Sequence, residues 1–443
     1  MTLRTLALSL AFTPLACAQS TLPAVFVANN GNIEGSVTSL TVAPTGNLTF
    51  VQKIITGSGN TAPANAGNNA YSISLSPNGR LLATSHATAA TITEKVTIFR
   101  VNADATLTQL GQFNTPDSPL DLKWLSDTTI AVTETRSTGQ NRLRVYTFNE
   151  PTLAWTLIDT EDCPGFTSAL ALHPAGTFLF AQHSPLSGGS SISSFAIATD
   201  GTLTAASNTP MGNYPLGPGV TPDGRFLYAA GGISGNVTTG FAIDANGTLN
   251  FLTGSPFPTP DSSPKQCVAS PDGRFVFVGH GSASTVRSFA LDEESGALTA
   301  LSFVFDVGIQ GALGDIATMR IPGRDLLLFT DRDFSTVNPN PRGILSYTIN
   351  PDGSFTQNGT IVDTQGVSPN DIATWSPPIT GCDDIDFNNN DVFPEDQDVI
   401  DFFNVLAGGD CPTCNDIDFN NNTVFPEDQD VIDFFTVLAG GTC

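Results

Sequence analysis

Short apolar segments alternate with tight turns along most of the chain, from about residue 22 to residue 377. Each unit has the order apolar strand, tight turn, apolar strand, loop, strand, turn and strand. The first turn of a unit places Pro before Gly, as in TPDGR at residues 221–225 and SPDGR at residues 270–274. Proline presets φ and glycine accepts a positive φ, so these turns favour hairpins. The pattern therefore predicts an all-β architecture.

The hairpin turns recur at a regular spacing. Their glycines are Gly79, Gly176, Gly224, Gly273 and Gly323. The last three gaps are 48, 49 and 50 residues long, and the first gap of 97 residues leaves room for a degenerate turn at residues 125–127. A second landmark, a turn leading into an outer strand such as GTLT at residues 201–204, marks seven units, with a weak copy near Trp155. Four strands in each repeat of about 40 to 50 residues are typical of a β-propeller, and seven outer strands predict seven blades.

The two ends of this region are complementary. The first unit has strands near Val25, Val37 and Leu48 but lacks an innermost strand, whereas residues 369–374 have the innermost pattern and no blade of their own. We expect residues 369–374 to complete the first blade. The predicted fold class is an all-β, seven-bladed β-propeller closed by its N- and C-terminal strands and followed by a small helical domain.

Residues 1–18 have the pattern of a signal peptide. Arg4 supplies a positive charge, residues 5–16 form a short, mostly apolar run, and Ala16-Cys17-Ala18 has the small-x-small form of a cleavage site. The run is too short to span a bilayer, and no later stretch of comparable hydrophobicity approaches membrane length. We therefore expect a secreted or cell-surface protein without a membrane span. Lipidation of Cys17 is the alternative, although Pro14 stands where such a signal has a branched aliphatic residue.

The charge balance excludes two classes of partner. The chain has 17 basic and 42 acidic residues, which give a net charge of −25 at pH 7. Proteins that bind nucleic acid or anionic membrane surfaces use lysine and arginine to neutralise phosphates. We expect neither as a partner.

The composition changes after the propeller region, which we expect to span residues 19–377, and a linker at residues 378–381. Residues 382–443 contain 15 acidic and no basic residues and consist of one unit written twice with an offset of 32. In the first copy, residues 399–406 have apolar side chains at helical spacing, and glycines follow them. The sequence predicts a second, small domain of two helical repeats.

Each repeat contains Asp and Asn side chains at alternating positions, followed by a later carboxylate. These residues are Asp386, Asn388, Asn390 and Asp398 in the first repeat and Asp418, Asn420, Asn422 and Asp430 in the second. Hard cations prefer such oxygen ligands. The repeats resemble the dockerin-type, EF-hand-like calcium loops, particularly the doubled form bounded by Gly and Cys at the C-termini of exported bacterial proteins. The resemblance implies calcium as a cofactor and a protein or surface partner for the tail.

The tail departs from this family at two places. The glycine expected at the sixth loop position is Asp391 in one copy and Thr423 in the other, and the closing carboxylate comes one residue late. A solvated acidic tail without metal is the alternative, and the twofold repetition of the Asp and Asn spacing argues against it.

Each repeat begins and ends with cysteine, which suggests the disulfides Cys382–Cys411 and Cys414–Cys443. Closing a loop of ~30 residues contributes roughly 3–4 kcal/mol in the chain-entropy model. Zinc bound by four cysteines is the alternative, but only Cys411 and Cys414 have the close spacing of zinc ligands. The remaining two cysteines, Cys163 and Cys267, are expected to be buried thiols.

The PDGR turns, a strand pair of the form Ile-Asp-x-x-Gly-Thr-Leu and the seven units together resemble the lactonase-type propellers, the family named for bacterial 6-phosphogluconolactonase. The resemblance covers about residues 22–377 and implies hydrolysis of a sugar lactone near the central channel. Members of the family commonly have Pro-Arg-His before an inner strand and Asn-Glu after the next strand. This chain has Pro264-Lys265-Gln266 and Gly279-His280 at these places. The chain therefore has the repeat pattern of the family but differs from it at these polar positions.

Polar residues recur at the end of the second strand of each unit. They are His86, His183 and His280, spaced by 97 residues, and Asn29, Glu134 and Asp331 in other units, with Gly231 in the remaining one. We expect these residues to form a polar ring at one mouth of the channel. The alternative is ordinary polar residues at strand ends. A metal site of three histidines is not expected, because alternate blades diverge around the channel.

Three of these residues are candidates for catalysis. His280 is expected opposite Lys265 across its hairpin, and lactone hydrolysis needs a base to activate water and a cation or donor for the oxyanion. His280 is the candidate base, Lys265 the candidate cation and Glu134 an alternative base. Two functions remain open: a binding and display module anchored through its dockerin-like tail, and a secreted lactone hydrolase with a rewired site. Phosphorylated substrates fit poorly, because arginine is sparse and no Gly-rich phosphate loop opens a helix.

Overall fold

The computed structural model describes fifteen segments of the chain. They are residues 22–31, 34–57, 70–86, 95–135, 141–184, 190–212, 216–232, 235–281, 285–306, 313–331, 343–376, 382–390, 392, 395–420 and 428–439. The predicted signal peptide at 1–18, the linker at 378–381, Asn422 and Cys443 lie outside these segments. The chain forms two compact units, divided between Trp375 and Ser376.

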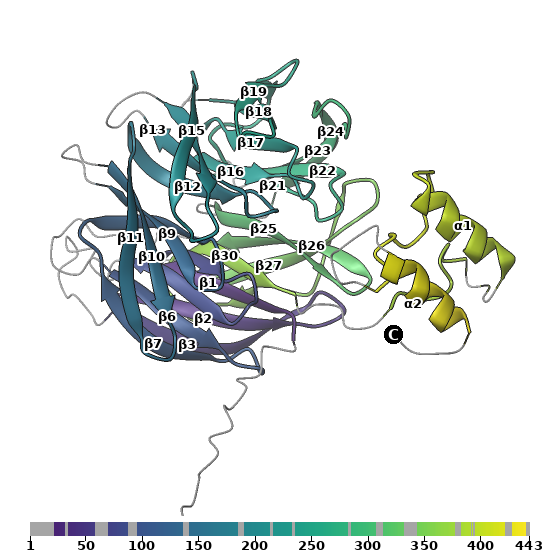
Figure 1. Ribbon diagram of the computed structural model, residues 1–443, viewed down its shortest axis with the longest axis horizontal. Coiled ribbons are helices and arrows are strands. Elements are labelled where there is room, and N and C mark those ends of the chain that lie inside the picture. Colours follow the sequence, from purple (N-terminus) through teal and green to yellow (C-terminus); the bar gives the residue numbers. More distant parts are fainter. Residues whose placement is uncertain are drawn as a thin grey trace, which may run out of the picture. The chain divides into compact units, whose positions relative to one another are not determined.

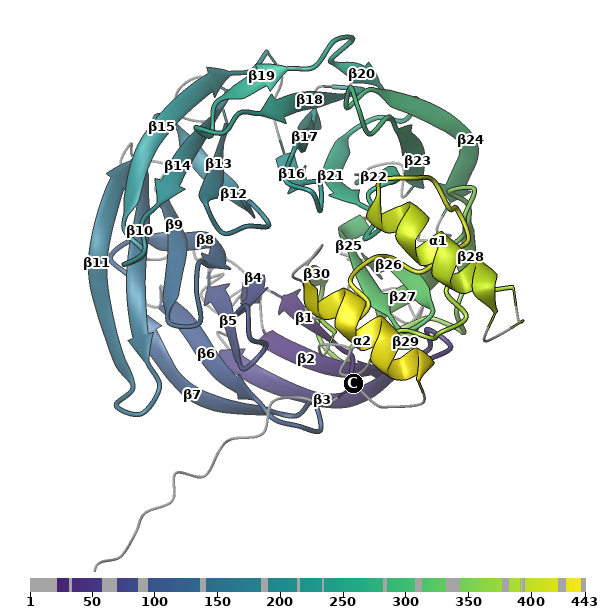
Figure 2. The same cartoon turned by 45° about the vertical axis from the view of Figure 1, so that its right-hand side comes forward.

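The first unit is a seven-bladed β-propeller, which confirms the predicted fold class (Figures 1 and 2). Within the described residues each blade is an antiparallel sheet whose strands follow one another from the channel outward. Blade 1 contains β30 (Pro369–Trp375), β1 (Ala24–Asn30), β2 (Gly35–Val42) and β3 (Leu48–Gly57). Blade 2 contains β4 (Ala70–Leu75), β5 (Leu81–His86), β6 (Lys95–Val101) and β7 (Leu107–Asn114). Blade 3 contains β8 (Ser118–Trp124), β9 (Thr129–Thr135), β10 (Asn141–Asn149) and β11 (Ala154–Asp162).

The later blades follow the same order, with two variations at the outer edge. Blade 4 contains β12 (Phe166–Leu172), β13 (Phe178–Ser184), β14 (Ser191–Ile197) and β15 (Leu203–Pro210). Blade 5 contains β16 (Leu216–Val220), β17 (Phe226–Ala230) and β18 (Val237–Ile243), and its outer edge is split between β19 (Leu249–Phe251) and β20 (Phe257–Pro258). Blade 6 contains β21 (Pro264–Ala269), β22 (Phe275–His280), β23 (Thr285–Leu291) and β24 (Leu298–Asp306). Blade 7 contains β25 (Leu313–Ile321), β26 (Arg324–Asp331) and β27 (Gly343–Ile349), edged by β28 (Phe355–Gln357) and β29 (Val362–Asp363).

The C-terminal strand of the propeller closes the ring. β30 pairs antiparallel with β1, with Val27 opposite Ile372, so that residues from the two ends of the unit share blade 1. This pairing confirms the expected closure by N- and C-terminal strands.

The turn sequences explain why the hairpins form where they do. In the SPDGR turn between β21 and β22, the Asp272 carboxylate accepts hydrogen bonds from the Ser270 hydroxyl at 2.5 Å and the Arg274 N–H at 3.1 Å. Gly273 takes a φ of 74°, which the turn requires and which glycine adopts without steric cost. The side chains thus satisfy backbone groups that the reversal leaves unpaired.

The hydrophobic core lies between neighbouring blades. Phe275 and Phe277 of blade 6 pack in one cluster with Leu327 and Phe329 of blade 7. The second strands are buried along nearly their whole length, because blades cover them on both faces, and this explains their continuous apolar runs.

The second unit contains two helices, α1 (Asp396–Leu406) and α2 (Asp428–Leu438), as the repeated apolar pattern predicts. Its core consists of matching residues from the two repeats, which are Ile385, Phe387 and Phe402 with Ile417, Phe419 and Phe434. The rings of Phe402 and Phe434 stack with their centroids 4.1 Å apart. Equivalent backbone bonds join the repeats: the Asp383 N–H donates to Phe419 O and the Asn415 N–H to Phe387 O. None of the described helices is long and apolar enough to cross a membrane.

The disulfide connectivity of the tail differs from the expected one. Cys411 and Cys414 are bonded to each other, with their Cα atoms 5.3 Å apart, so the pairings Cys382–Cys411 and Cys414–Cys443 are wrong. The short separation of these two cysteines at the junction of the repeats brings their sulfurs within reach. Cys382 is itself disulfide-bonded. Cys163 and Cys267 are free thiols, as expected; Cys267 is buried and Cys163 half-buried.

Candidate functional site

The innermost strands of all seven blades line one cavity of about 130 Å³, which we call the collar cavity. Figure 2 shows these strands, β4, β8, β12, β16, β21, β25 and β30, around the centre of the ring. The lining residues are Tyr71, Ser72, Asp121, Ser168, Ala169, Leu170, Leu216, Gly217, Pro218, Lys265, Gln266, Gly314, Asp315, Asn370 and Asp371. The cavity is therefore built from the same position of every repeat.

A β-bulge in each innermost strand produces this lining. In blade 6, Pro264 lies opposite His280 and Gln266 opposite Gly279, so that Lys265 is the extra residue of the bulge. In blade 4 the extra residue is Ser168. A bulge bends its strand and redirects the side chains there. These side chains consequently line the collar cavity instead of following the alternation of the sheet.

The bulge separates the two residues that the sequence predicts to act together. The Lys265 ammonium donates to the backbone oxygens of Gly314 and Leu313 across the cavity rim. His280 is fully buried, and neither of its ring nitrogens has a hydrogen-bond partner among the described residues. Burial lowers the pKa of His280 to about 4, although the Asp261 carboxylate opposes this shift. The structure therefore does not bring Lys265 and His280 into a hydrogen-bonded pair.

The other residues at the ends of the second strands also lie inside the blades. Asn29, His86, Glu134, His183 and Asp331 are buried, and none of them lines the collar cavity. The two nitrogens of His183 illustrate this, because they pair with the hydroxyls of Thr167 and Ser193 at 2.8 Å each, within blade 4.

Glu134, the alternative base, is held within blade 3. Its carboxylate accepts hydrogen bonds from the Tyr146 hydroxyl at 2.5 Å and the Asp117 N–H at 3.1 Å, and it pairs with Arg144. Burial raises the pKa of Glu134 to about 7, even though these partners favour the charged form. Its oxygens are occupied by the blade, and it does not line the collar cavity.

Three carboxylates of the cavity are not predicted by the sequence pattern. Asp121, Asp315 and Asp371 each accept a backbone N–H from the innermost strand of the next blade, at 2.6, 3.2 and 2.8 Å respectively. Asp121 also accepts the Ser72 hydroxyl at 2.5 Å. These carboxylates therefore fasten neighbouring blades to each other at the bulges.

The electrostatics of the collar follow from burial and from the close carboxylates. Burial raises the pKa of Asp121, and it raises that of Asp315 well above its usual value, where the adjacent Asp371 adds to the effect. Burial opposes the charge of Lys123, whose ammonium is 3.8 Å from Asp121, but the three carboxylates outweigh burial and raise its pKa. Asp121 has a signal in the sequence, since an acidic residue interrupts the apolar stretch of an innermost strand.

No three His, Cys, Asp or Glu side chains within the described segments are grouped so as to hold a metal ion. This includes His86, His183 and His280, which lie in three different blades.

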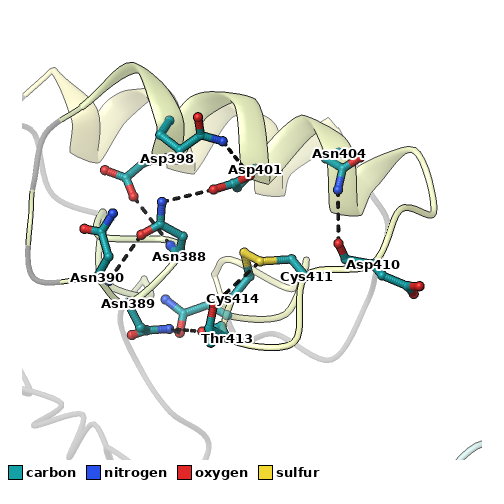
Figure 3. Close-up of a disulfide and its surroundings, with 12 residues drawn as sticks. Asn388, Asn389, Asn390, Asp398, Asp401, Asn404, Asp410, Cys411, Thr413 and Cys414 are labelled. Carbon is teal, nitrogen blue, oxygen red and sulfur yellow. Dashed lines mark hydrogen bonds between the residues drawn. A yellow bond between two sulfur atoms is a disulfide. The ribbon is translucent and has the colours of Figure 1, made fainter.

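The oxygen-rich loop of the first tail repeat has a different donor set, with two carboxylates and two amides. Asp386, Asn388 and Asp398 are buried, and Asp398 lies in the first turn of α1 (Figure 3). The Asn390 N–H donates to both Asp386 Oδ1 and Asn388 Oδ1, at 3.0 and 3.2 Å, and the Asn388 N–H donates to Asp398 Oδ1 at 3.4 Å. The loop thus collects the oxygens of an all-oxygen donor set, which fits a hard cation such as calcium.

The second repeat has a matching arrangement over the residues that the structure describes. Asp418 and Asp430 are buried, and the Asn420 N–H donates to Asp430 Oδ1 at 3.5 Å. The first loop is also joined to the disulfide segment, because the Asn389 amide donates to Thr413 O at 2.8 Å and Asn415 Oδ1 at 3.1 Å.

Comparison with known proteins bears on the propeller. The lactonase family, described as a seven-bladed β-propeller, matches residues 156–260 and 218–312 of this chain. A 6-phosphogluconolactonase of Yersinia pestis (strain Pestoides F) is 33% identical over 146 residues, which are 32% of this chain and 41% of that relative. The propeller is lactonase-like. The alignment spans less than half of that relative's length.

Solved structures agree with this lactonase-like fold. A protein from Bacteroides uniformis, provisionally assigned as a 6-phosphogluconolactonase, superposes with a TM-score of 0.65 over 80% of this chain and 99% of its own, at 15% identity. A second such protein, from Bacteroides fragilis, has a TM-score of 0.62 at 18% identity, over 80% of this chain and 98% of its own. At these identities the likeness concerns the fold alone.

Proposed function

We propose that this chain is an exported, lactonase-like propeller that binds a small ligand in its collar cavity and attaches to a partner through its tail, as a binding and display module. The observation that supports binding over catalysis is the commitment of the cavity's charged groups to the propeller itself. Asp121 accepts hydrogen bonds from Ser72, Leu122 and Leu170, and the Lys265 ammonium donates to backbone oxygens. Such groups give a site shape and polarity but are poorly free to activate water.

A direct test measures proton release during lactone hydrolysis. The full chain, without residues 1–18, is assayed in a pH-stat against a panel of sugar and aliphatic lactones, and binding of the same compounds is followed by calorimetry. A binding module gives saturable binding without turnover above the buffer rate. Turnover above that rate contradicts this proposal and supports the second one.

The second function is hydrolysis of a lactone in the same cavity, and the carboxyl pair Asp315 and Asp371 favours it. The raised pKa of Asp315 lets one carboxyl of the pair keep its proton while the other takes one from water. Water oxygen would then bond to the lactone carbonyl carbon, the ring C–O bond would break, and a carboxyl proton would pass to the leaving oxygen. Lys265 would face the oxyanion.

Substitutions separate this mechanism from the pair expected from the sequence. Hydrolysis in the collar cavity is lost in Lys265→Ala and Asp371→Asn and retained in His280→Ala, whose side chain does not line the cavity. Loss of turnover in His280→Ala with a normal melting temperature would instead support His280 as the base.

The tail completes the proposal. Asp386, Asn388, Asn390 and Asp398 would hold one calcium ion and Asp418, Asn420, Asn422 and Asp430 a second, and the ion would supply charge neutralisation for these loops. Residues 1–18 would direct export, which also suits the disulfides of the tail. Pull-down of extracellular partners by the tail, in calcium and in chelator, tests the attachment.

A further inference from the structure

Ser168 stands apart from the other polar groups of the collar cavity. Its hydroxyl oxygen is buried and has no hydrogen-bond partner among the described residues, although the residue lies on the bulge of β12 and lines the cavity. The Asn370 amide of the lining, in contrast, donates to Tyr71 O at 2.5 Å. Buried polar atoms are nearly always paired, so the unpaired Ser168 hydroxyl is available to a ligand oxygen once its side chain rotates toward the cavity.

The size of the cavity limits what can enter. Its volume of about 130 Å³ is close to that of cavities, on the order of 150 Å³, that accept one six-membered ring such as benzene. The part of a ligand held inside the collar is therefore one ring with polar substituents, and a larger ligand would extend out of the cavity.

The charged groups of the lining further restrict the chemistry of the ligand. Three carboxylates, Asp121, Asp315 and Asp371, face the cavity, against the ammonium of Lys265 at the rim and that of Lys123 beside Asp121. The Lys265 ammonium is held by backbone oxygens of β25, and no arginine of the described segments lines the cavity. A phosphate group adds nearly two negative charges and prefers a bidentate arginine or several free donors. The collar supplies neither.

We infer that the collar cavity binds one hydroxylated six-membered ring without negative charge, such as an unphosphorylated sugar lactone or its cyclic polyol analogue, with Ser168 contacting a ring oxygen. This inference rests on the proposed function, because it requires that the cavity binds a ligand. It separates this chain from relatives whose name specifies a phosphorylated lactone.

The test uses two stable rings that differ only in charge, 1,5-anhydro-D-glucitol and its 6-phosphate, titrated into the full chain by calorimetry. We expect saturable binding of the uncharged ring and at least about tenfold weaker binding of the phosphate. Ser168→Ala lowers the affinity for the uncharged ring by about three- to tenfold, as for one lost hydrogen bond. Ser207→Ala, in β15 of the same blade and outside the cavity lining, serves as the matched control and leaves it unchanged.

A second variant tests the electrostatic part. Asp371→Asn removes one carboxylate charge from the lining and therefore brings the two affinities closer together, which a purely structural role would not do. Equal or tighter binding of the phosphate by the unmodified chain overturns the inference and leaves binding in the cavity intact. Binding of neither ring overturns both. An unchanged affinity in Ser168→Ala, with an unchanged melting temperature, overturns the contact assigned to Ser168.

Discussion

His183 and His280 occupy the same position at the ends of β13 and β22, but their surroundings differ. Both are fully buried; the nitrogens of His183 are hydrogen-bonded to Thr167 and Ser193, whereas those of His280 have no partner among the described residues. Deleting one member of a buried hydrogen bond leaves the other unpaired, while deleting an unpaired group relieves a desolvation cost. The energetic roles of the two rings are therefore opposite.

His183→Leu is expected to lower the free energy of unfolding by about 1–3 kcal/mol, because it removes two buried hydrogen bonds, although the Thr167 and Ser193 hydroxyls keep Gly165 O and Asn208 Oδ1 as acceptors. His280→Leu is expected to remain within about 1 kcal/mol of the unmodified chain. Urea unfolding followed by tryptophan fluorescence measures both, since the three tryptophans, Trp124, Trp155 and Trp375, all belong to the propeller. A loss in His280→Leu as large as in His183→Leu would show that His280 has a stabilising partner.

His280 also makes the free energy of unfolding depend on pH, in a direction that follows from its pKa. The pKa of His280 is lowered to about 4 in the folded chain, so between pH 6.5 and pH 4 the unfolded chain binds a proton that the folded chain does not. Its contribution to stability is complete above pH 6.5 and is lost as the pH falls toward 4. His280→Leu should therefore reduce the loss of stability between pH 7 and pH 4.5 by roughly 2 kcal/mol.

Comparing the two chains at each pH removes other titrating groups from the result. Glu134, whose pKa is raised to about 7, acts with the opposite sign between pH 4.5 and pH 7 in both proteins. Equal pH slopes for the variant and the unmodified chain would contradict the assignment to His280.

At the scale of the strands, the bulges of the innermost strands have two consequences. Each bulge directs side chains into the collar cavity, and it leaves backbone N–H groups that the ladder cannot pair. Asp121 shows how these groups are satisfied, because one carboxylate accepts the N–H groups of Leu122 and Leu170 in two adjacent blades. The seam between blades 3 and 4 therefore depends on this side chain.

Asp121→Ala is expected to lower the free energy of unfolding of the propeller by about 3 kcal/mol, since it leaves three buried donors without an acceptor. Asp352→Ala is the matched control. Its carboxylate also accepts a backbone N–H and a hydroxyl, both from Ser354, but in an exposed outer turn. We expect a cost below about 1 kcal/mol there, again by tryptophan fluorescence in urea. Equal losses of unfolding free energy in the two variants would contradict the role of Asp121 in joining blades 3 and 4.

The elements that can be predicted from the sequence are those with local causes. The Pro and Gly residues of each turn fix a hairpin within a few residues, and their spacing reveals the repeat, so the blades and the closure by β30 follow. A bulge, in contrast, adds one residue to one strand and reverses which side chains face the axis, and no local signal marks it. For this reason the sequence places Lys265 opposite His280 and does not reveal Asp315 and Asp371 as lining residues.

At the scale of the whole molecule, the chain contains two units with separate cores. The aromatic core of the tail, which includes Phe387, Phe402 and Phe434, involves only residues of the tail. The repeat is also misleading for the disulfides there. Cysteines at equivalent ends of each copy suggest closure within a copy, whereas Cys411 and Cys414 are neighbours across the junction. Stability changes in one unit should therefore leave the other unit's transition in place.

Calcium should stabilise the tail alone. Its loops gather buried carboxylate and amide oxygens around Asp398 and Asp430, and a ligand that binds only the folded form raises stability by mass action. Scanning calorimetry of the full chain should show two transitions. The transition of the tail, which is recognised because tryptophan fluorescence does not change in it, should shift upward by about 10 °C at a calcium concentration 100-fold above the dissociation constant. The transition of the propeller should not shift. Asp398→Ala should reduce the shift, and Asp410→Ala, an exposed carboxylate on the same segment, should not. No heat of binding and no shift would leave the tail as an acidic domain held by its aromatic core and disulfides, and an equal shift of the propeller would place the ion elsewhere.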